Sequence, residues 1–151
     1  MIRGTSSASF SAPTVVILGT DLLLTARPAT PVQLAHACHA AGYTAALPVS
    51  WGDELLASAL ALRASARAGG PVIACVCPHV ADRFSGELDK FLLPVASPPV
   101  ATARYVRELY GAPVHITYVG ACPGANDPSI DARYTPGEFL ARIRELGIEV
   151  E

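Results

Sequence analysis

Short apolar runs alternate along this chain with longer segments that carry the signals of helix starts, and this alternation limits the possible folds more than any other feature. The apolar runs cover residues 14–19, 44–49, 71–76 and 114–120. Several of them contain almost no polar residue, which is typical of strands buried on both faces. Strands of this kind, separated by helices, form parallel sheets. We therefore predict an α/β fold, a mostly parallel sheet flanked by helices on both faces.

Helix starts are marked by Ser or Thr residues whose side-chain oxygens accept a hydrogen bond from a free backbone N–H group. Four helices are predicted to follow such residues, namely Thr30, Ser50, Ser97 and Thr135. Thr30 and Thr135 are followed at once by proline and, three positions on, by Gln or Glu, which is the pattern of a capping box. In the helix after Ser50 we expect one face to enter the core, formed by Leu55, Leu56, Ala59 and Leu60. A short strand over residues 148–150 is predicted after the last helix.

The composition favours one folded domain. Hydrophobic residues make up 51% of the chain and charged residues 16%, which excludes intrinsic disorder. The net charge of -2, without a cluster of basic residues, excludes a nucleic-acid partner, and no apolar run is long enough to span a membrane. In 151 residues we expect one domain over residues 14–151, preceded by a flexible N-terminal segment over residues 1–13. That segment lacks the apolar centre of a secretion signal, so we expect a cytoplasmic protein.

The cysteines are the residues with the clearest chemistry. There are four, at positions Cys38, Cys75, Cys77 and Cys122. In a reducing compartment they are metal ligands, reactive thiols or buried small residues rather than disulfides. Cys77 and Cys122 each precede a proline at the end of a predicted strand, where parallel sheets hold ligands. If those strands are neighbours, the two thiols lie close together, but zinc and cubane iron–sulfur sites normally need four protein ligands. A ligand role and a purely structural role both remain open.

Three stretches, around Cys77-Pro78, Ser97-Pro98 and Cys122-Pro123, keep the order and spacing of segments in a known family. They resemble the Cys-Cys-Pro, Ser-Pro-Met and Pro-Cys segments of the iron-only hydrogenase catalytic domain, and the resemblance extends over residues 14–150. It implies that Cys77 and Cys122 are metal ligands of a 4Fe-4S cluster. Cys75 stands where that family usually has a small residue, and it offers a third, cofactor-binding thiolate if its strand twists or bulges.

The chain also departs from this family at residues that the hydrogenase reaction needs. The proton-shuttling cysteine falls on Val76, and the lysine that holds the diatomic ligands of the diiron unit falls on Ala125. The family motif with the other two cysteine ligands is missing from these 151 residues. The resemblance therefore implies a degenerate domain without hydrogenase activity and without catalytic residues. Its cluster would be bound or shared for electron transfer, sensing or assembly, with a protein partner or in a homodimer.

Two other functions remain open. One is a metal-free scaffold for protein interactions. The other is a phosphatase, because Cys77 and Arg83 have the Cys-x5-Arg spacing of a loop in which a thiolate attacks phosphorus and an arginine binds the phosphate oxygens. Pro78 and Val80 argue against the phosphatase, since such loops need glycine and free backbone N–H groups to surround a phosphate.

A pair of histidines is the remaining possible ligand set. His36 and His39 lie three positions apart around Cys38, which puts both on one face of the predicted helix. No further ligand stands at a known distance from them. We interpret this segment as a half-exposed helix with Cys38 turned into the core.

Overall fold

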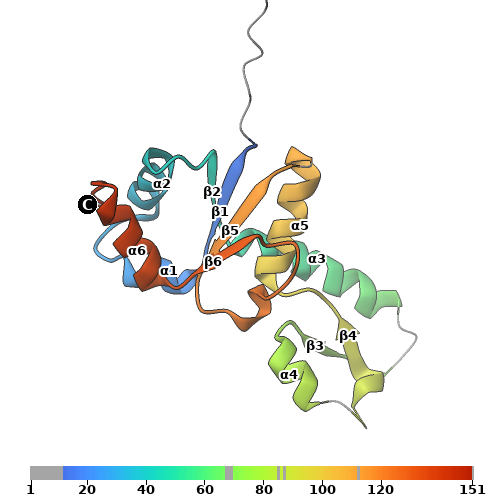
Figure 1. Ribbon diagram of the computed structural model, residues 1–151. Helices are drawn as coiled ribbons and strands as arrows, with labels where there is room; N and C mark the ends of the chain where they lie inside the picture. The colour runs from blue at the N-terminus through green and yellow to red at the C-terminus, as the bar shows by residue number, and fades with distance from the viewer. Residues whose placement is uncertain (1–11, 67–69, 85, 87, 112, 151) are drawn as a thin grey trace, which may run out of the picture.

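The structure is a computed structural model that describes residues 12–66, 70–84, 86, 88–111 and 113–150. Residues 1–11 of the predicted flexible segment lie outside the described residues. A four-stranded parallel sheet forms the centre, and helices cover both of its faces (Figure 1). The predicted fold class is therefore confirmed.

The central sheet has the strand order β2-β1-β5-β6, with all neighbours parallel. Its strands are β1 (Thr14–Leu18), β2 (Ala45–Pro48), β5 (His115–Val119) and β6 (Ala132–Tyr134). Val15, Val16 and Ile17 of β1 are fully buried, because helices cover both faces of this strand. Three of the four predicted strands are thus found in this sheet. The sequence did not predict β6, which has three residues and no apolar run.

The fourth predicted strand forms, but outside the central sheet. β3 (Ile73–Cys75) pairs in parallel with β4 (Leu92–Pro94) in a separate two-stranded sheet. Ala74 is exposed, and a strand with an exposed side chain does not suit a sheet whose two faces are both covered. Helix α4 (Pro78–Arg83) lies beside this small sheet, at one end of the molecule (Figure 1).

Each face of the central sheet has its own helices and its own core. On one face lie α1 (Thr20–Thr25), α2 (Pro31–Ala40) and α6 (Pro136–Glu145), and on the other lie α3 (Ser50–Ala66) and α5 (Pro98–Tyr110). The first core joins Val16 and Leu18 to Phe139, and the second joins Val15 and Ile17 to helix α5. Two 3-10 turns complete the fold, η1 (Asp89–Phe91) and η2 (Pro123–Ala125). None of the helices in the described residues is long and apolar enough to cross a lipid bilayer.

The predicted helix starts at Thr30 and Thr135 are confirmed as complete capping boxes. Ser97 precedes α5 but does not cap it, because its hydroxyl donates to the carbonyl of Gly124 instead. The strand predicted over residues 148–150 is wrong. Gly147 adopts a φ of 72°, which turns the chain so that the Ile148 amide bonds back to α6, and residues 148–150 carry no strand.

Helix α3 confirms the core face predicted for it only in part, because Ala59 and Leu60 are half-buried. Of its described residues, Gly52 and Leu56 are buried, whereas Leu55 is 39% exposed. Gly52 brings α3 against α5 so closely that a Cβ atom there would collide with the carbonyl of Pro98. The first turns of α3 therefore fix the helix to the body, and its later turns extend beyond the sheet (Figure 1).

The close contact between α3 and α5 predicts opposite effects for two glycine substitutions. Gly52→Ala is expected to lower the free energy of unfolding by about 1–3 kcal/mol, because its methyl group has no space. Gly137→Ala in α6 meets open space and is expected to raise it by about 0.5 kcal/mol, since alanine is the better helix former. Urea unfolding followed by circular dichroism compares the two. Equal changes in the unfolding free energy of the two variants would contradict the close contact between α3 and α5.

Candidate functional site

Two Cys-Pro turns adjoin at one corner of the molecule. Cys77 is the last residue before α4, and Cys122 is the last residue before η2. α4 and η2 are in contact, and a Cβ atom built on Gly124 would lie 3.4 Å from Cδ of Pro78. The strands that lead to these turns, β3 and β5, belong to different sheets. It is the turns, and not neighbouring strands, that come together.

The three cysteines of this corner differ in their surroundings. Cys122 is exposed, and Cys75 and Cys77 are half-buried. The thiol of Cys75 donates to the backbone carbonyl of Cys77 over 3.4 Å and so ties the end of β3 to the start of α4. All three thiols are free.

Two side chains, Asp21 of α1 and Tyr118 of β5, hold the Cys122 turn. Asp21 accepts a hydrogen bond from the Ala121 amide over 2.6 Å, although 100 positions separate the two residues. The hydroxyl oxygen of Tyr118 accepts a hydrogen bond from the backbone amide of Cys122. Burial, together with the nearby Cys122 and Asp21, raises the pKa of Tyr118 to about 12, so its hydroxyl keeps its proton at neutral pH.

Tyr118 and Asp21 also fill the carboxyl edge between β1 and β5, where parallel sheets commonly bind ligands. The strand ends there carry glycine, and a Cβ atom on Gly19 or Gly120 would collide with Asp21 and with the hydroxyl of Tyr118. Tyr118 is 3% exposed. Any ligand of this edge must therefore lie further out than these two side chains.

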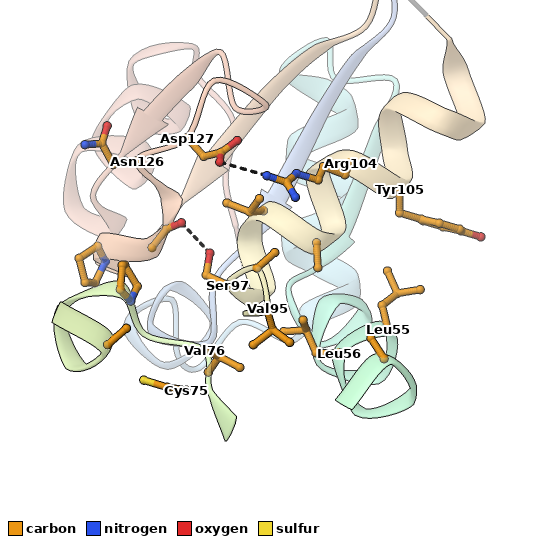
Figure 2. Close-up of a pocket in the computed structure, with 18 of the residues that line it drawn as sticks. Leu55, Leu56, Cys75, Val76, Val95, Ser97, Arg104, Tyr105, Asn126 and Asp127 are labelled. Atoms are coloured by element: carbon orange, nitrogen blue, oxygen red, sulfur yellow. Dashed lines mark hydrogen bonds and ion pairs between the residues drawn. The ribbon is translucent and has the colours of Figure 1, made fainter. Parts of the chain in front are cut away.

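Ser97 holds the same turn from the side of α5. Its buried hydroxyl donates to the Gly124 carbonyl over 2.6 Å, a bond drawn in Figure 2. Gly124 packs so closely that a Cβ atom there would lie 2.6 Å from Cβ of Ser97. The sequence predicts that a helix begins after Ser97, but no sequence pattern near Ser97 indicates its hydrogen bond to Gly124, 27 positions away.

Arg107 of α5 fixes the rest of the loop that connects β5 to β6. It donates to the Ser129 carbonyl over 3.0 Å and to the Val114 carbonyl over 3.2 Å. It also pairs with Asp131 over 2.8 Å. Sequence reasoning missed this contact as well, because its partners are far apart along the chain.

A pocket of about 800 Å³ opens between α3, α5, the small sheet and the Cys122 loop. Figure 2 shows Leu55 and Leu56 on one side of it and Cys75 and Val76 on another. Arg104 and Asp127 form an ion pair at its rim over 3.4 Å. Hydrogen bonds from Ser129 hold the pKa of Asp127 below its usual value, so this carboxylate stays charged at neutral pH. The pocket thus has apolar walls and a charged rim.

Comparison with known proteins identifies this architecture. No protein-family model and no curated protein matches the chain. A solved structure of FeFe-hydrogenase HydA1 from Chlamydomonas reinhardtii, a variant, aligns with a TM-score of 0.73 and 17% identity over 97% of this chain and 46% of that one. A HydA structure that reveals stepwise H-cluster assembly aligns with a TM-score of 0.68 and 16% identity, over 97% and 45% of the two chains. The fold is that of an FeFe hydrogenase. It spans less than half the length of these hydrogenases.

The thiols of this hydrogenase-like domain do not form a complete metal site. A cubane cluster normally takes four protein ligands. The part of the chain that the structure describes contains no group of three or more His, Cys, Asp or Glu residues arranged to hold a metal ion. Cys77 and Cys122 therefore fit a cluster only if other ligands come from outside the described residues.

The segment from Cys77 to Arg83 does not form a phosphate-binding loop. The segment after Cys77 is helix α4 up to Arg83, and the amides of Val80 and Ala81 bond to the Cys77 carbonyl. Those amides are not free to surround a phosphate, which counts against the phosphatase alternative.

Cys38 of helix α2 is fully buried while His36 and His39 are exposed, which confirms the predicted orientation of α2.

The burial of the thiols predicts their order of reaction with iodoacetamide. Burial raises the pKa of the Cys38 thiol to about 12, so at pH 8 only about one Cys38 thiol in ten thousand is ionised. Cys122 is exposed and is expected to react first. Mass spectrometry of the native protein at successive times measures the order. Labelling of Cys38 as fast as Cys122 would contradict the described core.

The hydroxyl of Ser97 is expected to contribute measurably to stability. Ser97→Ala leaves the Gly124 carbonyl without its buried donor, which costs about 1–3 kcal/mol of unfolding free energy. The control is Thr25→Ala, which removes an exposed hydroxyl bonded to the Asp21 carbonyl and should change stability by less than about 0.5 kcal/mol. Urea unfolding of both variants tests this, and a Ser97→Ala protein as stable as the control would disprove it.

Proposed function

We propose that this hydrogenase-like domain supplies two thiolate ligands, Cys77 and Cys122, to an iron–sulfur cluster whose remaining ligands come from another polypeptide segment. The observation that carries the proposal is the contact between the two Cys-Pro turns, at Pro78 and Gly124. Cys75, which lines the pocket beside them, is the candidate for a third thiolate.

The solved structures support the choice of cofactor. One similar structure, of HydA, reveals stepwise assembly of the FeFe-hydrogenase H-cluster, and another concerns the degradation of the 2Fe subcluster of the H-cluster during oxygen inactivation of an FeFe hydrogenase. When bound, such a cluster supplies one-electron transfer. In this chain Asp21, Tyr118 and Ser97 hold the backbone around Cys122 and so orient its thiol before any metal arrives.

The role we propose is electron transfer, sensing or assembly without hydrogen turnover. Two positions support the absence of turnover. Val76 stands where the resemblance places the proton-shuttling cysteine, and Ala125, which is buried, stands where it places the anchoring lysine. Neither side chain can give up or accept a proton or carry a charge, so these two positions supply no group that moves protons to a diiron unit.

Anaerobic reconstitution of the full chain with iron and sulfide tests the proposal. We expect bound iron and sulfide in the wild type, because thiolates on two adjoining turns bind iron together when small thiols from the buffer supply the other ligands. Cys77→Ser and Cys122→Ser are each expected to lose most of that iron. Cys38→Ala is the matched control, since Cys38 lies in the core and should not affect metal content.

Two outcomes would contradict the proposal. One is a colourless, iron-free wild type after reconstitution. The other is an iron content that neither Cys77→Ser nor Cys122→Ser lowers. Either result would favour the metal-free interaction scaffold, for which the exposed leucines of α3 are the specific supporting observation.

A further inference from the structure

A separate pocket of about 350 Å³ lies on the face of the central sheet that carries α2 and α6. Its floor includes the first residues of β1, β5 and β6, which are Thr14, His115 and Ala132. Its walls are the turn that follows α2 and one side of α6. We refer to it as the α6 pocket. Its volume falls at the lower end of the range of small-molecule sites, about 300–1,000 Å³, and so indicates a small ligand rather than a protein partner.

The local sequence explains why this space stays open. Gly42 adopts a φ of 94°, which ends α2 and lets the amide of Tyr43 bond back to the Cys38 carbonyl over 3.1 Å. This turn fixes Tyr43 at the wall of the α6 pocket. Thr14 and Ala132 have short side chains, so they do not fill the space between the turn and α6.

Three aromatic rings line the α6 pocket. The ring centroid of Phe139 lies 6.1 Å from that of Tyr43 and 6.4 Å from that of Tyr134. Phe139 is buried, whereas both tyrosines are half-buried, so part of each tyrosine side chain stays accessible. Flat rings of this kind favour contact with another planar apolar group.

Arg142 of α6 brings a positive charge to the α6 pocket. Its guanidinium carbon lies 5.7 Å from the ring centroid of Tyr134, which is a cation–π contact. Neither of the ion pairs found in the described residues includes Arg142. Glu138, one turn earlier on α6, bonds instead to the amide and the hydroxyl of Thr135. The N–H groups of Arg142 are therefore available to an acceptor from outside the chain.

The other polar side chains of the α6 pocket all carry a hydrogen-bond donor. Among the described residues that line it, none is Asp or Glu, whereas Asp82, Glu108 and Asp127 line the pocket beside the cysteines. Burial raises the pKa of Tyr43, so its hydroxyl keeps its proton at neutral pH and can donate. His115 adds a ring N–H group. The α6 pocket therefore suits an anion and not a cation.

We propose that the α6 pocket binds a small aromatic carboxylate, with its ring against Tyr43 and Tyr134 and its carboxylate on Arg142. The planar guanidinium of an arginine donates two parallel N–H bonds to a carboxylate. One guanidinium balances the single negative charge of a carboxylate, whereas a phosphate monoester carries up to about two at neutral pH. In the described parts of the chain, the α6 pocket shares no lining residue with the pocket beside the cysteines. This proposal is thus independent of the iron–sulfur proposal.

Titration of the isotope-labelled full chain with cinnamate, followed by NMR, tests this binding. We expect saturable shifts of the amide signals of Tyr43, Arg142 and Leu146, with a Kd of about 1 mM or below. The neutral compound cinnamamide keeps the ring and lacks the charge, so we expect it to bind at least about tenfold more weakly. The absence of saturable shifts up to about 10 mM cinnamate, or equal affinity for the two compounds, overturns the proposal.

A matched pair of variants tests the role of Arg142. Arg142→Gln is expected to weaken cinnamate binding at least about tenfold, because it removes the charge that pairs with the carboxylate. Arg144→Gln is the control, since Arg144 is also exposed on α6 but lines a different pocket, and it should leave the affinity unchanged. Circular dichroism checks that both variants fold. Equal losses of affinity in the two variants, or no loss in Arg142→Gln, overturn the proposal.

Discussion

Strand β1 is hydrogen-bonded along both edges and buried on both faces, and the position of everything else follows from it. Its pairing with β2 and β5 sets the register of the central sheet. Because β1 ends beside β5, Asp21 reaches the Ala121 amide, which lies 100 positions further along the chain. The local placement of the Cys122 turn is thus a consequence of strand pairing in the core.

The two halves of the candidate site are anchored differently. The Cys122 turn is fixed to the central sheet and α5 by Asp21, Tyr118 and Ser97. The Cys77 turn belongs to the small β3–β4 sheet and α4, and α4 has no buried residue. An iron–sulfur cluster held by both thiols, as we propose, would crosslink these two parts of the molecule, and metal content and rigidity would then change together.

Local sequence signals predicted the elements well, because they act within a few residues. The capping boxes at Thr30 and Thr135 and the apolar run of β1 are examples. Long-range contacts were not predictable. Ser97 looks like a cap but bonds to Gly124, and the apolar leucines of α3 look like a core face although only Leu56 is buried among them. A helical pattern records which residues share a face and does not record whether another element covers it.

The candidate site was predictable in its residues but not in its construction. The sequence marked Cys77 and Cys122 by their place at strand ends, and the turns do adjoin. It gave no sign that β3 leaves the central sheet, because a short apolar run of this kind fits either sheet. The roles of Asp21 and Tyr118 were also missed, since each depends on the pairing of strands that are far apart along the chain.

The separation of the Cys77 and Cys122 sulfur atoms in a crystal structure decides whether both thiols can bind one cluster. We expect a separation below about 7 Å, a distance at which two thiolates bind one metal centre. Sulfur atoms well beyond this distance, or pointing to different sides of the molecule, would contradict it.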